Sequence, residues 1–440
     1  MTSYTIVLTF IVALGGLLYG FDTAVISGTL NYIQPYFGLS EAGLGWTVSS
    51  LLFGSLAGVY LAGVIGQRWG RKPSMSAASL IFILSALLSA LSVNLWMFVS
   101  ARIIGGVAVG IVSTLAPVYI AEVAPARYRG MLVSFNQLAI VIGILIAFFT
   151  NYFLVDTGEN NWRWMLSVMA APSILLFLAL FFVPESPRWL VEHGYREQAI
   201  AVLKRNLHAS DVTREVAEIE DSFRVKEEVS YRELMSAPNR KVLLIAFVLC
   251  IFQQITGINT IMYYAPKIFA MNGYSGDIAL LQTVVIGVLN LVSTIVAILI
   301  VDKVGRKPLL LLGSLGMGLS LLALSVLYRL GLQGGTGVLA AILCYISFFS
   351  LSLGPVIWVV ASEIFPNRIR SKGMSAAMTG MYAANILVTV SFPVMLTRLN
   401  GATTFFIFFL VCICCFLYVL KYIPETKGKS LEELERLLKK

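Results

Sequence analysis

The segment AEVAPARYRG at residues 121–130 returns later in the chain as SEIFPNRIRS at residues 362–371. Each copy has a glutamate, then a proline, then two arginines at the same spacing. Two further pairs recur: GRKP at 70–73 and 305–308, and PESPRWL at 184–190 with PETKGKS at 424–430. The three pairs are 241, 235 and 240 residues apart. The sequence therefore predicts two similar halves that follow each other in the same orientation.

Composition places both halves in a membrane. The 440 residues are 58% hydrophobic and only 12% charged, whereas soluble domains carry about twice that charged fraction. A helix needs about 20 mostly apolar residues to cross the hydrocarbon core. Twelve stretches meet that requirement, at residues 6–28, 46–66, 74–93, 97–120, 131–152, 164–183, 242–265, 279–301, 308–328, 337–361, 373–396 and 403–423.

The distribution of basic residues predicts the orientation of these spans. Of 32 Lys and Arg residues, one lies within a span, Arg102. Only four fall on the side opposite the charged motifs, namely Arg163, Lys267, Arg329 and Arg398. Basic loops stay in the cytoplasm, so both termini are predicted to be cytoplasmic. The net charge of +9 thus reflects topology and does not indicate a nucleic-acid partner.

A charged segment after the sixth span divides the chain. We predict an N-terminal bundle over 1–184, a cytoplasmic helical linker over 185–241, a C-terminal bundle over 242–424 and a tail over 425–440. Within the linker, YREQAIAVLKRNL and REVAEIEDSFRVKEE have helical spacing. The linker is too charged to enter the bilayer.

Parallel six-helix repeats joined by such a linker fit the major facilitator architecture. The motifs GRKP, PESPRWL, QQITGIN (253–259), GPVIWVVASEIFP (354–366) and PETKG (424–428) resemble those of the sugar porter family over essentially the whole chain. The resemblance implies an all-α membrane protein with the major facilitator fold. Its 12 transmembrane helices would form two six-helix bundles.

Two opposite charges lie within the spans, Asp22 and Arg102. Both fall in the outer half of the bilayer at a rise of about 1.5 Å per residue, so they are predicted to meet. A buried carboxylate is costly unless it is paired, protonated or hydrated, which favours a proton-coupling role. The same pair makes the chain most similar to bacterial proton-coupled glucose and pentose symporters. The alternative is a permanent ion pair that locks two helices together.

Carboxamides within the spans are candidate sugar ligands, because an amide offers a donor and an acceptor to neighbouring hydroxyls. They are Gln137, Gln253, Gln254, Asn259, Asn290 and Asn385. The family resemblance assigns all of these except Asn385 to the sugar site, and places Trp358 against the sugar ring. Tyr263 and Phe21 are predicted to wall the site. The alternative is that the amides make interhelical hydrogen bonds.

Helix-breaking residues and charged motifs predict the moving parts. Gly257, Gly354 and Pro355 should interrupt spans seven and ten, either as gates or as static kinks. Two charge networks should form the cytoplasmic gate, from Arg71, Glu122, Arg129 and Glu185, and from Asp302, Arg306, Glu363, Arg370 and Glu425. The family places an aspartate where this chain has Gln67, which cannot carry a charge.

Several functions are excluded by what the sequence lacks. The two histidines lie in the linker, and the five cysteines fall within spans without accompanying metal ligands. We expect no enzyme activity, no metal and no cofactor. The predicted function is proton-coupled symport of a monosaccharide, with glucose as first candidate, by a monomer in the bacterial inner membrane. The alternatives are a passive sugar uniporter and a non-transporting membrane sugar sensor.

Overall fold

The chain is described by a computed structural model. It describes residues 2–125, 128–206, 209–224, 236–332, 336–365 and 369–427. Within these ranges, twelve helical segments are long and apolar enough to cross a membrane, which confirms the predicted number of spans. Their helices are α1 Ser3–Tyr36, α2 Glu41–Arg68, α3 Arg71–Ala90, α4 Leu95–Val123, α5 Arg129–Leu154, α6 Asn161–Ser167 with α7 Ala170–Leu180, α12 Ala237–Ile255 with α13 Ile258–Met271, α14 Gly276–Val304, α15 Arg306–Arg329, α16 Thr336–Leu351 with α17 Leu353–Ile364, α18 Arg370–Arg398 and α19 Asn400–Tyr422.

Spans seven and ten are interrupted, as the sequence predicted. Helix α12 gives way to α13 at Gly257, whose φ of 95° lies in the left-handed region that glycine adopts without a Cβ clash. Helix α16 gives way to α17 at Ser352, just before Gly354. Span six is also divided, but the residues that join α6 to α7, Val168 and Met169, keep helical backbone angles.

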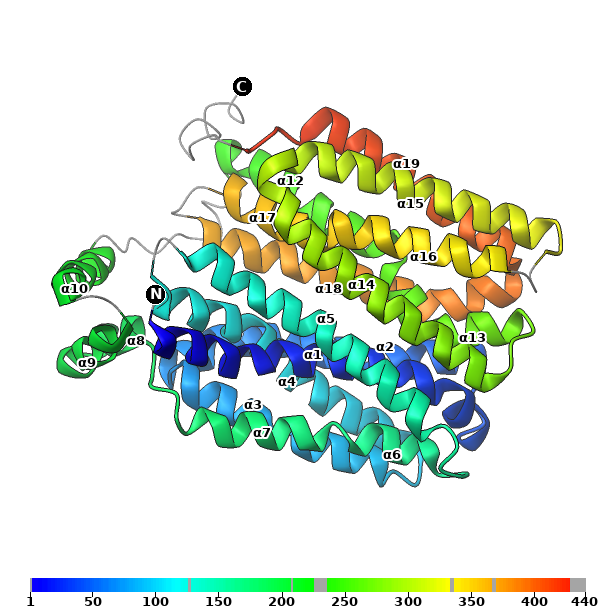
Figure 1. Cartoon of the computed structure of the whole chain (residues 1–440), viewed down its shortest axis with the longest axis horizontal. Coiled ribbons are helices and arrows are strands. Elements are labelled where there is room, and N and C mark those ends of the chain that lie inside the picture. The colour runs from blue at the N-terminus through cyan, green and yellow to red at the C-terminus, as the bar shows by residue number, and fades with distance from the viewer. Residues whose placement is uncertain are drawn as a thin grey trace. The chain divides into compact units, whose positions relative to one another are not determined.

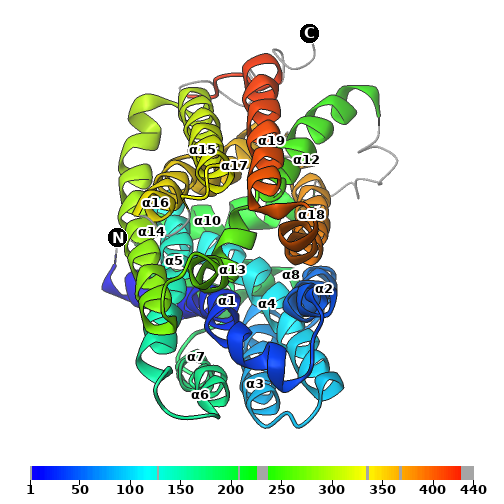
Figure 2. The same cartoon turned by 90° about the vertical axis from the view of Figure 1, so that its right-hand side faces the viewer.

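The described helices group into two compact units. Unit 1 comprises Met1–Val25 and Ser50–Glu228, and unit 2 comprises Ile26–Ser49 and Val229–Lys440. In unit 1, α3 packs against α4, α6 and α7 (Figure 1). In unit 2, α15 packs against α16 and α19, and α12 packs against α18 (Figure 2). The bundle boundaries at residues 184, 241 and 424 stay predictions.

The part of α2 that belongs to unit 1, from Ser50 onward, crosses α4 at backbone contact. A Cβ added to Gly106 of α4 would lie 2.0 Å from the Leu51 carbonyl oxygen of α2, and one on Gly110 would lie 2.2 Å from that of Ser55. Gly54 and Gly58 of α2 meet α4 in the same way. Small residues four apart allow such close packing in lipid, where no hydrophobic effect drives helices together. This crossing holds the helix that carries Arg102.

The first part of the predicted linker folds as three short helices of unit 1, α8 Pro187–Glu192, α9 Arg196–Asn206 and α10 Ala209–Arg224. They lie at one end of that unit's long helices (Figure 1). Leu190 of α8 packs with Ala199 and Val202 of α9. Both predicted helical segments are therefore confirmed up to Arg224. The remainder, residues 225–235, lies outside the described ranges.

Candidate functional site

The charged pair within the spans meets, as the sequence predicted. Asp22 of α1 and Arg102 of α4 are each 2% exposed. Arg102 donates from Nη1 to the Oδ1 atom of Asp22, and from Nη2 to the backbone carbonyl of Asp22 at 3.4 Å. Desolvation makes such a pair expensive, and removing one partner leaves an uncompensated charge. The pair therefore depends on both side chains.

The pairing leaves half of the carboxylate unused. Neither Oδ2 of Asp22 nor Nε of Arg102 has a hydrogen-bond partner in the described part of the chain. A buried polar atom without a partner is unusual and calls for an explanation. Oδ2 is thus the atom of this pair that is available to take a proton.

Three of the predicted sugar ligands form one continuous hydrogen-bonded chain in unit 2. Asn259 donates to Gln254 Oε1 at 2.6 Å, and Gln254 donates to Gln253 Oε1 at 3.2 Å. Gln253 donates to the carbonyls of Leu353 and Gly354, at 2.9 and 3.3 Å. These carbonyls belong to the first turn of α17, so the amides join the break in span seven to the break in span ten.

The three amides of this hydrogen-bonded chain differ in their partners. The Nε2 group of Gln253 donates to the α17 backbone, as expected if the amides make interhelical hydrogen bonds instead of binding sugar. Asn259 is half-buried and ends the chain, whereas Gln253 and Gln254 are buried.

The other predicted ligands are distributed over several helices of both units. Asn290 accepts from Ser350 at 2.6 Å, and Asn385 accepts from Thr389 of the same helix at 3.1 Å. Trp358 is half-buried on α17 and Tyr263 is buried on α13, both in unit 2. Gln137, half-buried on α5, and Phe21, buried on α1, belong to unit 1. Their roles as sugar contacts stay predictions.

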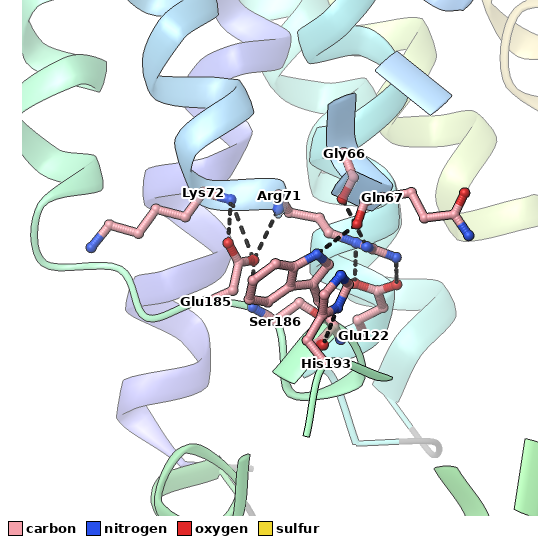
Figure 3. Close-up of polar contacts among 9 residues, drawn as sticks. Gly66, Gln67, Arg71, Lys72, Glu122, Glu185, Ser186 and His193 are labelled. Atoms are coloured by element: carbon pink, nitrogen blue, oxygen red, sulfur yellow. Dashed lines mark hydrogen bonds and ion pairs between the residues drawn. The ribbon is translucent and has the colours of Figure 1, made fainter. Parts of the chain in front are cut away.

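A charge network in unit 1, here called the N-half network, consists of Arg71, Glu122, Glu185 and Ser186 (Figure 3). Arg71 donates to both carboxylate oxygens of Glu122, from Nε at 3.0 Å and from Nη2 at 2.8 Å. Glu185 instead accepts from the backbone N–H groups of Arg71 and Lys72, at 2.9 and 3.2 Å. It thereby caps the start of α3, where free N–H groups favour an anion.

Unit 2 contains the counterpart, the C-half network of Asp302, Arg306, Glu363, Glu425 and Thr426. Arg306 contacts Glu363 at 2.9 Å and Asp302 at 3.0 Å. Glu425 accepts from the backbone N–H groups of Arg306 and Lys307, at 3.0 and 3.1 Å, and so caps α15. The side chains of Arg129 and Arg370, also predicted here, lie outside the described part of the chain.

Gln67 distinguishes the two networks. At its position in the other half, Asp302 pairs with Arg306. The backbone carbonyl of Gln67 accepts a hydrogen bond from the Trp189 indole at 2.8 Å, and Arg71 bonds to the Gly66 carbonyl at 2.9 Å (Figure 3). Arg71 therefore bonds to one backbone carbonyl of α2, whereas Arg306 bonds to both the Val301 carbonyl and the Asp302 carboxylate of α14.

Sequence reasoning missed two hydroxyl groups in these networks. Ser186 donates to Glu122 at 2.5 Å, and Thr426 donates to Glu363 at 2.5 Å. The sequence did contain an indication of them, because each hydroxyl residue directly follows the Pro-Glu pair that is repeated in the motifs at 184–190 and 424–430. A hydroxyl residue at the same place in both halves indicates a shared role.

The two capping glutamates are expected to respond to pH with opposite signs. Burial raises the pKa of Glu185 above its ordinary value of 4.5, more than its backbone hydrogen bonds lower it. For Glu425, burial acts in the same direction, but hydrogen bonds from Lys427, Arg306, Lys307 and Thr426 hold the pKa below 4.5. Protonated Glu185 therefore stabilises the folded protein below pH 4.5, and this stabilisation is lost as the pH rises through the pKa that Glu185 has in the folded state. Ionised Glu425 stabilises the folded protein above pH 4.5, and this stabilisation is lost as the pH falls through the pKa that Glu425 has in the folded state.

The measurement is the melting temperature of the purified protein in detergent between about pH 7 and pH 4. Relative to Glu185→Gln, the unmodified protein should gain melting temperature as pH falls. Relative to Glu425→Gln, it should lose melting temperature over the acid end of the range. Differences of the same sign for both variants would contradict the assignment.

A third polar cluster lies within unit 2, away from the charged motifs. Lys267 of α13 contacts both oxygens of Glu41 at the start of α2, at 2.9 and 2.7 Å, and Gln34 Oε1 near the end of α1 at 3.2 Å. Gln34 also donates to Glu41 at 3.0 Å. The lysine side chain is 14% exposed and the glutamate 29%. This cluster ties three helices together with one cation.

We expect Lys267→Met and Glu41→Gln each to lower the melting temperature, and the double variant to lower it by less than their sum. The coupling should be about 0.5–1 kcal/mol, because the pair is partly screened by solvent. Exchanging the charges, Lys267→Glu with Glu41→Lys, should recover part of the loss. Arg398→Met, at an exposed cation, is the control. Strictly additive single effects would show that the contact contributes nothing.

No group of three His, Cys, Asp or Glu side chains in the described residues is placed to hold a metal ion. Cys412 and Cys415 are buried, whereas Cys414 is exposed, and all three are free thiols.

The twelve spans define a polytopic membrane protein. The chain belongs to the sugar transporter family: the family model described as "Sugar (and other) transporter" matches residues 8–438. This is a family of transporters and not of enzymes. It also establishes the chain as a multi-pass membrane protein.

Named relatives are similar over nearly the whole length. A D-xylose-proton symporter of Escherichia coli is 40% identical over 474 aligned positions, covering 99% of this chain and 96% of the relative. The glucose transporter GlcP of Staphylococcus epidermidis is 38% identical over 425, covering 96% and 95%. The partially occluded inward-open structure of the xylose transporter XylE from E. coli aligns with a TM-score of 0.88 at 38% identity, covering 98% of this chain and 100% of that one. The fold is accordingly that of the major facilitator superfamily, as predicted.

Proposed function

We propose that this protein is a proton-coupled monosaccharide symporter that works by alternating access. One observation carries the proposal: Asp22 and Arg102 form a buried ion pair within the spans, and one carboxylate oxygen of Asp22 has no partner. An ionisable residue kept at such a position marks an ion or proton pathway more often than a structural contact. The named proton symporter among the relatives supports the same function.

The pair suggests how a proton changes the protein. While Asp22 is ionised, Arg102 holds α1 against α4 through the carboxylate and the backbone carbonyl of Asp22. Protonation of Asp22 removes the charge that holds Arg102 and weakens this attachment. With sugar bound as well, the outward-to-inward transition becomes favourable, because the two ligands then prefer the same state.

For the sugar, we propose Gln137, Gln253, Gln254, Asn259, Asn290 and Asn385, with Trp358, Tyr263 and Phe21 as apolar contacts. Asn259 is the best-supported of these, since it is the half-buried end of the amide chain in unit 2. A sugar hydroxyl bound there connects through Gln254 and Gln253 to the first turn of α17. Sugar binding would in this way act on both interrupted spans, seven and ten, which we propose to be gates.

We further propose a bacterial inner-membrane location with both termini in the cytoplasm. The N-half and C-half networks would then form the cytoplasmic gate and break when the protein opens inward. Glucose is the first candidate substrate. A pentose is the second, since relatives of similar identity are named for xylose and for glucose.

The test is reconstitution of the whole chain into liposomes and uptake of labelled glucose, xylose and arabinose with and without an inward proton gradient. A symporter concentrates its substrate only when the gradient is present. Equilibration without concentration under a gradient would show a passive uniporter. Absence of entry for every monosaccharide tested would favour the non-transporting sensor.

A further inference from the structure

The unpaired oxygen of Asp22 lies beside a glycine of α4 whose side-chain position is filled by a serine hydroxyl. A Cβ added to Gly105 of α4 would lie 3.6 Å from Asp22 Oδ2, and only 2.3 Å from the Ser85 hydroxyl of α3. The Ser85 hydroxyl therefore occupies the place that a side chain at Gly105 would take, close to Asp22. All three residues belong to unit 1.

Ser85 can offer only one kind of hydrogen bond to Asp22. Its side chain is buried, at 4% exposure, and its hydroxyl hydrogen is donated to the Ala101 carbonyl at 2.8 Å. A hydroxyl has one hydrogen and two acceptor lone pairs. With the hydrogen engaged, Ser85 presents lone pairs. A lone pair cannot bond to a carboxylate oxygen, but it accepts well from the O–H of a carboxylic acid.

The charges around Asp22 favour protonation at Oδ2. In the described residues, the charged side chain that acts on Asp22 is Arg102 of α4, and it donates to Oδ1 of the carboxylate. The neighbour contributed by α3 is the neutral Ser85. A proton arriving at the pair is thus directed away from the guanidinium and toward Oδ2, on the side of Ser85.

We propose that Ser85 and Gly105 are positioning residues for the proton-coupling step. A hydronium ion transfers its proton to Oδ2 of Asp22 and leaves as water. The new O–H then turns to donate to Ser85 Oγ, which lies close by because Gly105 has no side chain, while Arg102 loses its anionic partner. On release, the proton returns from Oδ2 to water and the ion pair forms again. The inference rests on the proposed symport function.

The deciding experiment compares Ser85→Ala with Ser79→Ala in the full chain, reconstituted in liposomes. Ser79 is the matched control, because it is also buried on α3 and also donates to a backbone carbonyl, that of Ser76 at 2.7 Å. The measurement is the external pH at which gradient-driven sugar uptake is half-maximal. Ser85→Ala should move this pH to the acid side by about 0.5–1 unit, since one hydrogen bond to the protonated form is lost. Ser79→Ala should not move it.

Two further variants separate positioning from folding. Ser85→Thr keeps the hydroxyl and should retain the original half-maximal pH. Gly105→Ala places a methyl group 2.3 Å from the present position of the Ser85 hydroxyl, so it should displace that hydroxyl and reduce gradient-driven accumulation more than sugar exchange. Sugar exchange at saturating proton concentration, measured for every variant, reports whether the protein is folded.

The outcomes distinguish this inference from the proposed function. If the unmodified protein does not concentrate any sugar under a proton gradient, the symport function fails. If it does concentrate sugar and Ser85→Ala has the same half-maximal pH as Ser79→Ala, only the role of Ser85 is overturned. If Ser85→Thr shifts as far as Ser85→Ala, the hydroxyl is not the responsible group.

Discussion

Replacing Asp22 with asparagine is expected to abolish sugar accumulation driven by a proton gradient while sugar exchange continues. Asparagine has nearly the same shape and can still accept a hydrogen bond from Arg102, but it cannot bind a proton. With one proton per sugar, a gradient of one pH unit supports about tenfold accumulation. The variant should fall to a ratio of about one in the same liposomes.

The matched control is Asp277→Asn, which removes an exposed aspartate in the first turn of α14. It should accumulate sugar as the unmodified protein does. Full accumulation by Asp22→Asn would show that the ion pair is only a lock between α1 and α4. Loss of both accumulation and exchange would show that Asp22 is needed for folding or for every step of the cycle.

Gly106→Leu is expected to prevent stable folding of unit 1. The glycine lies against the Leu51 carbonyl of α2, where an added Cβ would be only 2.0 Å from the oxygen. Overpacking normally costs about 1–3 kcal/mol because side chains move aside. A backbone carbonyl in a helix cannot rotate away, so α2 and α4 must separate and Arg102 must shift with α4. The yield of monodisperse protein and its melting temperature in detergent should both fall sharply.

Gly63→Leu is the control for this substitution. Gly63 lies on the same helix α2, is exposed, and has nothing within 4 Å of an added Cβ. Leucine is also among the better helix formers, whereas glycine costs about 0.8–1 kcal/mol relative to alanine. This variant should therefore keep or raise the melting temperature. Equal behaviour of the two variants would mean that the crossing of α2 and α4 is not tightly packed.

The spans could be predicted because the bilayer imposes their length. A hydrocarbon core requires about 20 apolar residues per crossing, and such runs are visible without any tertiary information. Their ends were less predictable. The first span was predicted over 6–28, but α1 continues to Tyr36. A polar side chain such as that of Gln34 does not stop a helix. The Gln34 side chain here forms hydrogen bonds with Glu41 and Lys267.

The candidate site was predictable only in part. Depth along two helices was enough to predict that Asp22 and Arg102 meet. Nothing in the order of residues indicated that Gln253, Gln254 and Asn259 bond to one another. Their donors and acceptors are equally suited to a sugar. Whether they bond to a sugar or to the protein depends on where the first turn of α17 lies.

Hydropathy and motif spacing are properties of the linear chain, so the residues alone were enough to predict the membrane class, the twelve spans, the repeated halves and the family. The folded structure was needed to show which oxygen of Asp22 is unpaired, which glutamates cap helix starts, and that the Ser85 hydroxyl fills the place of a side chain at Gly105. Those features depend on contacts of a few ångströms between helices far apart in the chain. Hydrogen-bond direction and steric exclusion act only at that range.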